Sequence, residues 1–189
     1  MKIAITGKIG SGKSEITKLL KEFGAFVVSA DEMNKRLLRD KAYLCLLEKH
    51  FPEAFSSGYF DKKALTSIVF SDVKKRELLN NLAHPEIFRL IQSEIEGKEF
   101  AFVEVPLLSS EQAKNFDKVW FVTASEEERV KRVKKRDGRR QEEIEKIFLA
   151  QQNISEKLYD NAILIENDGN IALLSEKISK LYNNAKISK

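Results

Sequence analysis

The chain has 189 residues, of which 42% are hydrophobic and 33% are charged, and this composition excludes an intrinsically disordered protein. Its formal net charge of +4 and its pI of about 9.0 suit either a nucleic-acid partner or a small ligand that carries several phosphates. No apolar run reaches the roughly 18 residues of a membrane span, so the sequence predicts no membrane association. Cys45 is the only cysteine, which excludes an internal disulfide, and with no export signal ahead of the first apolar run we expect a cytoplasmic protein.

The basic residues gather in one segment, residues 129–140, while the rest of the chain is close to neutral. No aromatic residue interrupts this segment, so the stacking platform of a single-strand-binding protein is missing. We therefore expect small phosphate-bearing ligands and no nucleic-acid partner. For the oligomeric state we expect a monomer or weak oligomer.

The first apolar run, Lys2–Thr6, predicts a β-strand and leads directly into the segment GKIGSGKS at Gly7–Ser14. This segment fits the P-loop pattern GxxxxGK[ST], and an amphipathic helical pattern follows it. Glycines let the loop backbone curl so that successive N–H groups point at phosphate oxygens, which predicts an ATP site. We expect Lys13 to reach the β- and γ-phosphates and the Ser14 hydroxyl to bind Mg²⁺. The predicted ATP-binding residues of the loop are Gly7, Lys8, Ile9, Gly10, Ser11, Gly12, Lys13 and Ser14.

Asp31 follows the second predicted strand, Ala25–Ser29, almost directly. Ligands of a parallel sheet collect beyond the carboxyl ends of its strands, so this carboxylate should face the same crevice as the P-loop. Aspartate is also a preferred helix N-cap, and position alone leaves both interpretations open.

The stretch between Asp31 and Lys98 is too long for one crossover between neighbouring strands. Its periodicity predicts a helical insertion, and the proline of the pair His84-Pro85 predicts a break within it, since the residue before a proline is pushed out of the α region. The expected helices are Glu32–Leu38, Ala42–His50, Lys62–Leu82 and Pro85–Glu96.

Three more apolar runs predict strands at Phe100–Val105, Lys118–Thr123 and Ala162–Glu166. Five strands alternating with helices indicate one α/β folding unit, a five-stranded parallel sheet with helices on both faces. Glu104 lies near the end of its strand, where P-loop proteins usually carry an acidic residue for the metal. The sequence leaves a residue linked to Mg²⁺ and a solvated edge glutamate equally open.

An arginine stripe occupies the basic segment, with spacings of three, four and four residues that would place its members on one helical face. The stripe consists of Arg129, Arg132, Arg136 and Arg140. Guanidinium groups can bind a transferring phosphoryl group in a bidentate manner, so we assign Arg132 and Arg136 to phosphate binding. Arg129 stands beside three glutamates, and for it we expect a solvated position.

The pair Asp137-Gly138 interrupts this stripe between two predicted helices, Glu126–Arg136 and Glu142–Asn153. A glycine at such a break indicates a hinge, which gives a short helix-loop-helix rich in arginine.

Several segments, taken together in their order, resemble the dephospho-coenzyme A kinase family across nearly the whole chain. They read TGKIGSGKS, VVSADEMNKRLL, AHPEIF, VEVPLL, a lid segment that ends in IFLAQQ, and ENDGN. The resemblance implies ATP-dependent phosphorylation of the ribose 3′-hydroxyl of dephospho-CoA, on a P-loop kinase fold with a helical CoA-binding insertion and a mobile lid. It implies a nucleotide-binding core at residues 1–36, 98–136 and 154–189, an acceptor-binding insertion at 37–97, and a lid at 137–153.

The resemblance also assigns roles to residues at matching positions. It implies catalytic roles for Asp31, Lys13, Arg132 and Arg136, nucleotide contacts for Arg140, Asn167 and Gly169, a lid-helix glutamine at Gln151, and acceptor contacts for Asp31, Lys35, His84, Pro106 and Leu107. The chain departs from the family pattern at Ser29, at Ser109-Ser110 and at Arg140-Gln141, which leaves the support around the site and the details of the lid open.

Two alternatives remain at this point. A P-loop kinase for another nucleoside or small hydroxyl acceptor would share the P-loop and the lid. A non-catalytic nucleotide switch would share the P-loop, but it has no need of an acceptor base such as Asp31 or of an arginine lid.

Overall fold

The structure, a computed structural model, describes residues 1–187. Two compact units make up the chain: Met1–Ser29 joined by the chain from Gly97 onward, and Ala30–Glu96. Among the residues that the structure describes, no helix is long and apolar enough to cross a membrane. The functional division into core, insertion and lid stays a prediction.

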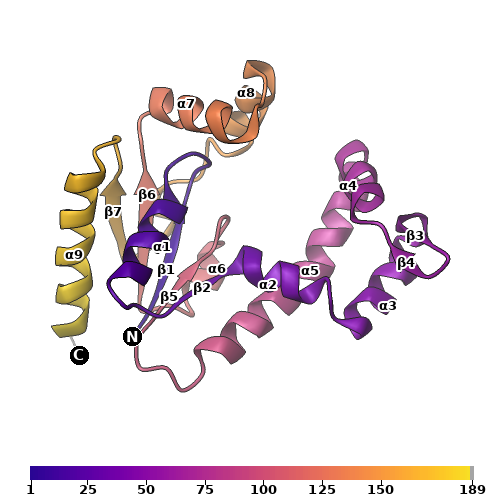
Figure 1. The fold of residues 1–189 in the computed structure, drawn as a ribbon, viewed down its shortest axis with the longest axis horizontal. Coiled ribbons are helices and arrows are strands. Elements are labelled where there is room, and N and C mark those ends of the chain that lie inside the picture. Colours follow the sequence, from indigo (N-terminus) through magenta and orange to yellow (C-terminus); the bar gives the residue numbers. More distant parts are fainter. Residues whose placement is uncertain (188–189) are drawn as a thin grey trace. The chain divides into compact units, whose positions relative to one another are not determined.

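The first unit contains the predicted five-stranded parallel sheet, which confirms the fold class (Figure 1). The strand order β2-β5-β1-β6-β7 places β1, the strand before the P-loop, at the centre, with Ile3 beside Phe102 on one side and Lys118 on the other. The strands are β1 (Lys2–Gly7), β2 (Val27–Ser29), β5 (Ala101–Glu104), β6 (Lys118–Thr123) and β7 (Ala162–Glu166).

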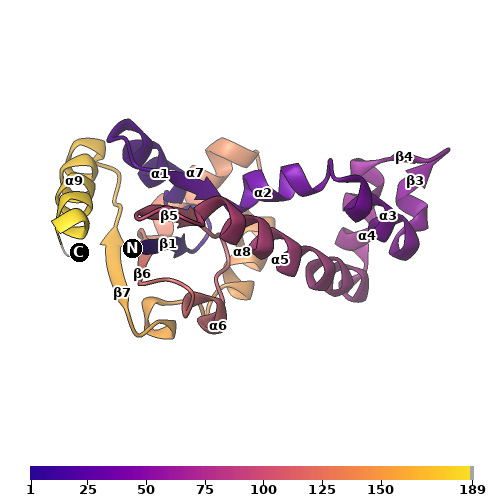
Figure 2. The same cartoon turned by 90° about the horizontal axis from the view of Figure 1, so that it is seen from below.

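Helices α1 (Lys13–Glu22) and α9 (Ile171–Ile187) pack on one face of this sheet around a core of aliphatic and aromatic side chains. Phe102 lies at its centre, fully buried between the rings of Trp120 and Tyr182. On the other side of the sheet from α9 lie α6 (Ser110–Ala113) and the short η2 turn (Glu156–Leu158) (Figure 2). Helices α7 (Glu126–Asp137) and α8 (Gln141–Ala150) complete the unit.

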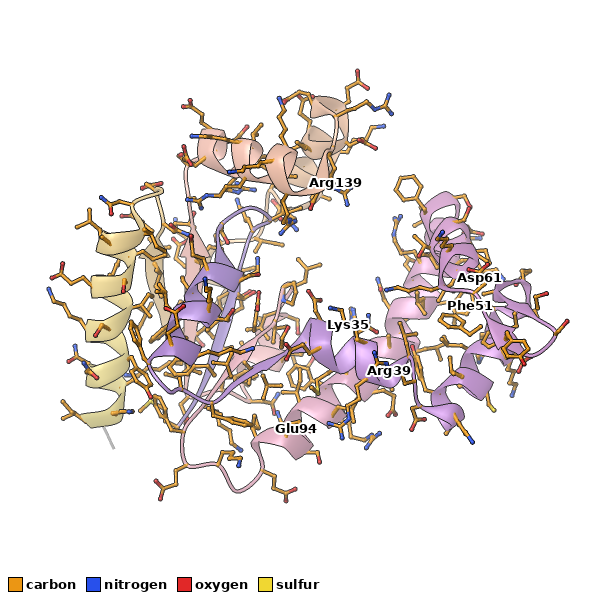
Figure 3. The ribbon with its side chains drawn as sticks, viewed as in Figure 1. Lys35, Arg39, Phe51, Asp61, Glu94 and Arg139 are labelled. Atoms are coloured by element: carbon orange, nitrogen blue, oxygen red, sulfur yellow. The ribbon has the colours of Figure 1, made fainter. Side chains whose placement is uncertain are left out.

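The second unit is helical, with one small hairpin. Its apolar core includes Leu47, Phe51 and Leu65, and Asp61 caps α4 by accepting hydrogen bonds from the backbone N–H groups of Lys63 and Ala64 (Figure 3). Its elements are α2 (Ala30–Leu37), α3 (Lys41–His50), η1 (Pro52–Ala54), β3 (Phe55–Ser56), β4 (Tyr59–Phe60), α4 (Lys62–Ser71) and α5 (Val73–Ile95).

The predicted break at His84-Pro85 is wrong, because α5 runs through Pro85 without interruption. A proline inside a helix costs about 3 kcal/mol, but Leu82 and Ile87, on either side of it, both pack on the apolar core and oppose that cost. The break lies at Asp72 instead, whose carboxylate accepts hydrogen bonds from the backbone N–H groups of Lys74 and Lys75 and so starts a new helix.

The hairpin between β3 and β4 was not predicted. Ser57 and Gly58 both have positive φ angles, 50° and 80°, as a tight two-residue hairpin turn requires. The Ser-Gly pair between aromatic residues in FSSGYF is the signal that could have indicated it.

Phe102 provides a test of the sheet core, because its ring packs against three other aromatic rings, those of Phe100, Trp120 and Tyr182. Phe102→Ala should lower the free energy of unfolding by about 3–5 kcal/mol, since the cavity adds to the lost burial. Urea unfolding measures the change. Leu173→Ala, at a position of α9 that is 63% exposed, is the control and should change it by less than about 0.5 kcal/mol; equal losses would contradict this core.

Candidate active site

The P-loop joins the end of β1 to the start of α1 and depends on glycines that no other residue could replace. Gly7 has φ 144°, and an added Cβ would collide with the carbonyl oxygen of Val122 on the neighbouring strand. Gly12 has φ 93°, and a Cβ there would collide with the Asn167 side-chain amide. Left-handed backbone and close contact together require glycine at both places.

Gly12 also begins α1 without a side-chain cap. The first N–H groups of a helix have no partner within it, and they carry the positive end of the helix dipole. The uncapped start of α1, directly after the loop, is therefore suited to bind an anion such as a phosphate.

Lys13, the first residue of α1, folds its side chain back over the loop. Its Nζ donates hydrogen bonds to the carbonyl oxygens of Gly7, at 2.8 Å, and Lys8, at 3.1 Å. This ammonium group lies beside the same loop whose N–H groups are suited to an anion, so it can add a full positive charge to that site.

Ser14 lies next to Glu104, as a shared metal site would require. The Ser14 hydroxyl donates to Glu104 Oε1 at 3.3 Å. The hydroxyl of Thr17, one helical turn on, shares its hydrogen between the Ser14 carbonyl oxygen at 3.1 Å and Glu104 Oε2 at 3.4 Å. Within residues 1–187, no group of three or more His, Cys, Asp or Glu side chains is placed to hold a metal ion by itself, so the oxygens here are those of one carboxylate and two hydroxyls. Such a set of oxygens suits Mg²⁺, which usually binds through one or two protein ligands together with waters and substrate phosphates.

Asn167 and Arg132 both contact the outer side of the P-loop. The buried Asn167 side chain donates to the carbonyl oxygen of Ser11 at 3.1 Å and to Glu15 Oε2 at 3.2 Å. Arg132 Nη1 donates to the carbonyl oxygens of Gly10 and Ser11, both at 3.3 Å, and its Nη2 donates to that of Asn167 at 2.9 Å. These two residues therefore hold the loop backbone from the side of β7 and α7.

Arg129 is buried, so the expectation of a solvated arginine at this position is wrong. Only 7% of it is exposed, its Nε donates to the carbonyl oxygen of Ile9 at 2.9 Å, and its guanidinium carbon lies 4.0 Å from the centre of the Phe148 ring. Burial lowers the pKa of Arg129, while the charge of Glu126 opposes that shift. Arg129 and Arg132 share a face of α7, as their spacing predicts, and the P-loop lies against that face, whereas Arg140 lies beyond the end of α7.

The other two arginines of the stripe are exposed near the turn between α7 and α8, where Gly138 ends α7 with φ 63° (Figure 3, near Arg139). Arg136 donates two hydrogen bonds to Asp137, at 2.7 and 2.9 Å, and this contact is the main reason why the pKa of Asp137 is lowered. The backbone N–H of Arg140 donates to Glu143 and starts α8.

Gly169, the other glycine that we expect beside the nucleotide, has φ 101°, and a Cβ added there would lie 3.7 Å from a carboxylate oxygen of Glu128.

The segment after β5 contains Pro106, half-buried, and Leu107, 57% exposed. The carbonyl oxygen of Leu108 accepts a hydrogen bond from the Tyr159 hydroxyl at 2.8 Å, and burial raises the pKa of Tyr159. Ser109, one of the departures from the family pattern, forms a capping box with Gln112 and starts α6. Its hydroxyl thus has a local structural role.

The expected acceptor residues of the second unit are all exposed. Asp31 and Lys35 lie on α2, and His84 lies on α5. Helix α2 begins at Ala30, so Asp31 is inside its first turn and not in the N-cap position. Arg36, on the same helix, pairs with Glu94 of α5, which Figure 3 labels.

Thr17 and the contact of Gln151 with the loop were not identified from the sequence. Thr17 stands three residues after Ser14, on the same helical face, which is the signal that could have indicated a second hydroxyl near Glu104. The Gln151 Oε1 accepts a hydrogen bond from the Ile9 N–H at 2.8 Å, and nothing in the sequence pattern links these two residues.

Comparison with known proteins gives consistent results. The family model described as dephospho-CoA kinase matches residues 1–172. A dephospho-CoA kinase of Thermus thermophilus is 36% identical over 179 residues, which cover 89% of this chain and 84% of that protein. A crystal structure from Thermus thermophilus aligns with a TM-score of 0.79 and 33% identity over 98% of this chain and 97% of that one. The dephospho-CoA kinase of Campylobacter jejuni aligns with a TM-score of 0.65 and 25% identity over 97% of this chain and 96% of that one. With the P-loop, the sheet order and these matches in agreement, the chain belongs to the dephospho-CoA kinase family.

Proposed function

We propose that this protein transfers the γ-phosphoryl group of ATP to the ribose 3′-hydroxyl of dephospho-CoA, directly and in line. The P-loop at the uncapped start of α1, in a chain of the dephospho-CoA kinase family, is the observation that carries this proposal. An assay of ADP release with and without dephospho-CoA tests it. ADP release that does not depend on dephospho-CoA would contradict it.

On the donor side, the loop N–H groups and the start of α1 bind the phosphates of ATP. Lys13 exchanges its bonds with the Gly7 and Lys8 carbonyl oxygens for the β- and γ-phosphates, and its charge is then placed where charge develops during transfer. Arg132, Arg136 and Arg140 are the further cations that we assign to the nucleotide, with Asn167 and Gly169 beside it. The bonds of Arg132 to the loop make it, in addition, a support of the loop backbone.

Mg²⁺ would be held by Ser14, with Glu104 as a direct ligand or as the acceptor for a metal-bound water. When bound there, the ion supplies positive charge to the β- and γ-phosphate oxygens. Thr17 holds the other oxygen of Glu104 and so orients the carboxylate.

On the acceptor side, Asp31 accepts a hydrogen bond from the attacking 3′-hydroxyl and takes its proton as transfer proceeds. Its exposed position in the first turn of α2 leaves the carboxylate accessible to a ligand. Lys35, His84, Pro106 and Leu107 are the residues that we assign to dephospho-CoA. No covalent enzyme intermediate is needed, since the hydroxyl attacks the phosphoryl group itself.

Lys13→Ala should fold normally and lose transfer. Activity should fall by at least about a hundredfold, because one charge contact to the transition state is removed. Steady-state kinetics and a thermal melt measure the two effects. A rate near that of the wild type would contradict the assignment of the donor site.

Asp31→Asn separates a base from a structural carboxylate. Asparagine keeps the size and hydrogen-bonding capacity of the side chain but cannot take the hydroxyl proton, so turnover should fall by about a hundredfold or more. The melting temperature and the ATP affinity should stay unchanged. Turnover of dephospho-CoA within about threefold of wild type would place the base elsewhere.

Glu104→Gln tests the metal assignment. The amide keeps the shape of the carboxylate but has no negative charge, so the Mg²⁺ concentration needed for half-maximal activity should rise by about tenfold. A Mg²⁺ titration at saturating ATP measures this. Glu166→Gln, at an exposed position on the edge strand β7, is the matched control and should leave the titration unchanged.

A further inference from the structure

The backbone of Ile9, in the P-loop, is held on both sides of its Cα by side chains from α7 and from the end of α8. Its carbonyl oxygen accepts a hydrogen bond from Arg129 Nε of α7 at 2.9 Å. Its N–H donates to Gln151 Oε1, directly after α8, at 2.8 Å. These two bonds hold the peptide groups before and after the Ile9 Cα, and neither group can rotate without breaking its bond, so the orientation of this part of the loop is set from outside the loop.

The backbone of α7 also touches the loop directly at the same place. A Cβ added at Gly10 would lie 2.7 Å from the carbonyl oxygen of Arg129 and 3.0 Å from its Cα. In Figure 1 the loop between β1 and α1 lies beneath α7. Arg129 therefore lies where the backbone of α7 comes close to the backbone of the P-loop.

The Arg129 guanidinium packs on α8 as well. Its central carbon lies 4.0 Å from the centre of the Phe148 ring, a stacking distance for a cation on an aromatic face. Phe148 and Gln151 are three residues apart near the end of α8. One end of this helix thus holds Ile9 twice, directly through Gln151 and indirectly through Phe148 and Arg129.

The burial of Arg129 is unfavourable for stability by itself. No carboxylate forms an ion pair with it among residues 1–187, and its buried Nη2 has no hydrogen-bond partner there. A buried charge of this kind usually contributes little to stability compared with an apolar side chain of similar volume. The bond to Ile9 and the contact with Phe148, which together link the loop to α8, account for an arginine at this place.

We propose that Arg129 is a positioning residue that holds the P-loop in its ATP-binding shape and transmits the position of α8 to the loop through the backbone of Ile9. The inference rests on the proposed ATP-dependent function but not on the identity of the acceptor. Without Arg129 the Ile9 carbonyl oxygen loses its partner, the loop samples other conformations, and ATP must order the loop when it binds.

Arg129→Met tests this proposal, because methionine keeps an unbranched apolar stem against Phe148 but removes the hydrogen bond and the charge. The dissociation constant for ATP, measured by calorimetry without acceptor, should rise by about tenfold, and kcat should stay within about threefold. Amide exchange of residues 8–12 should become faster, while the melting temperature stays near that of the wild type.

Lys134→Met is the matched control, since it removes one positive charge from an exposed position of the same helix. It should change neither ATP binding nor exchange in the loop. An equal loss of ATP affinity in Lys134→Met would mean a general charge effect and would overturn the proposal. Weaker ATP binding by Arg129→Met with unchanged amide exchange in the loop would mean the same and would also overturn it. Wild-type values for Arg129→Met in both measurements would also overturn it.

Phe148→Leu is the second test variant, for the case that Arg129→Met does not fold. This change leaves the guanidinium and its bond to Ile9 in place but removes the ring, so affinity for ATP should fall by about threefold and loop exchange should rise. Wild-type ATP affinity in folded Phe148→Leu would rule out the connection through α8. A wild-type protein that binds ATP but does not phosphorylate dephospho-CoA would contradict the proposed function and leave this inference intact.

Discussion

A phosphate-binding loop has to turn its N–H groups towards the ligand, and the carbonyl oxygens on its other side then need partners of their own. In this protein, cationic and amide side chains supply them. Lys13 binds the carbonyl oxygens of Gly7 and Lys8, and Arg129 binds that of Ile9. Arg132 and Asn167 bind those of the following residues. Since unpaired buried carbonyl groups are costly, the shape of the loop depends on these side chains as much as on its glycines.

This constraint explains why the four arginines of α7 and the following turn do not act as one set. The first two face the P-loop and are held by its carbonyl oxygens, whereas Arg136 and Arg140 are exposed and pair with nearby carboxylates. Exposed pairs are weak and can be exchanged for a phosphate at little cost. A single helix thus both supports the loop and carries groups that remain accessible to a ligand.

The oxygens on the metal side of the site are also placed by contacts outside the site. Glu104 is placed by the register of β5 against β1, and Ser14 and Thr17 lie one helical turn apart on α1. Strand and helix are both anchored in the core around Phe102 and Trp120, so packing far from the ligand determines where the oxygens meet. Precision at the site therefore depends on the rigidity of the sheet.

The sequence by itself determined the class of fold, the five strands, the P-loop and the family. Each of these depends on local periodicity, on a compact motif, or on the order of several motifs along the chain, and all can be recognised without knowing any contact. The sequence analysis placed the helix break at Pro85, because a proline locally disfavours a continuous helix. In the structure Asp72 caps a new helix instead, and the core contacts of Leu82 and Ile87 keep that helix continuous through Pro85. Only the tertiary structure decided which arginines are buried. Helical spacing places Arg129 and Arg132 on one face, but whether that face meets water or the P-loop depends on contacts between residues about 120 positions apart, and no local pattern encodes those contacts.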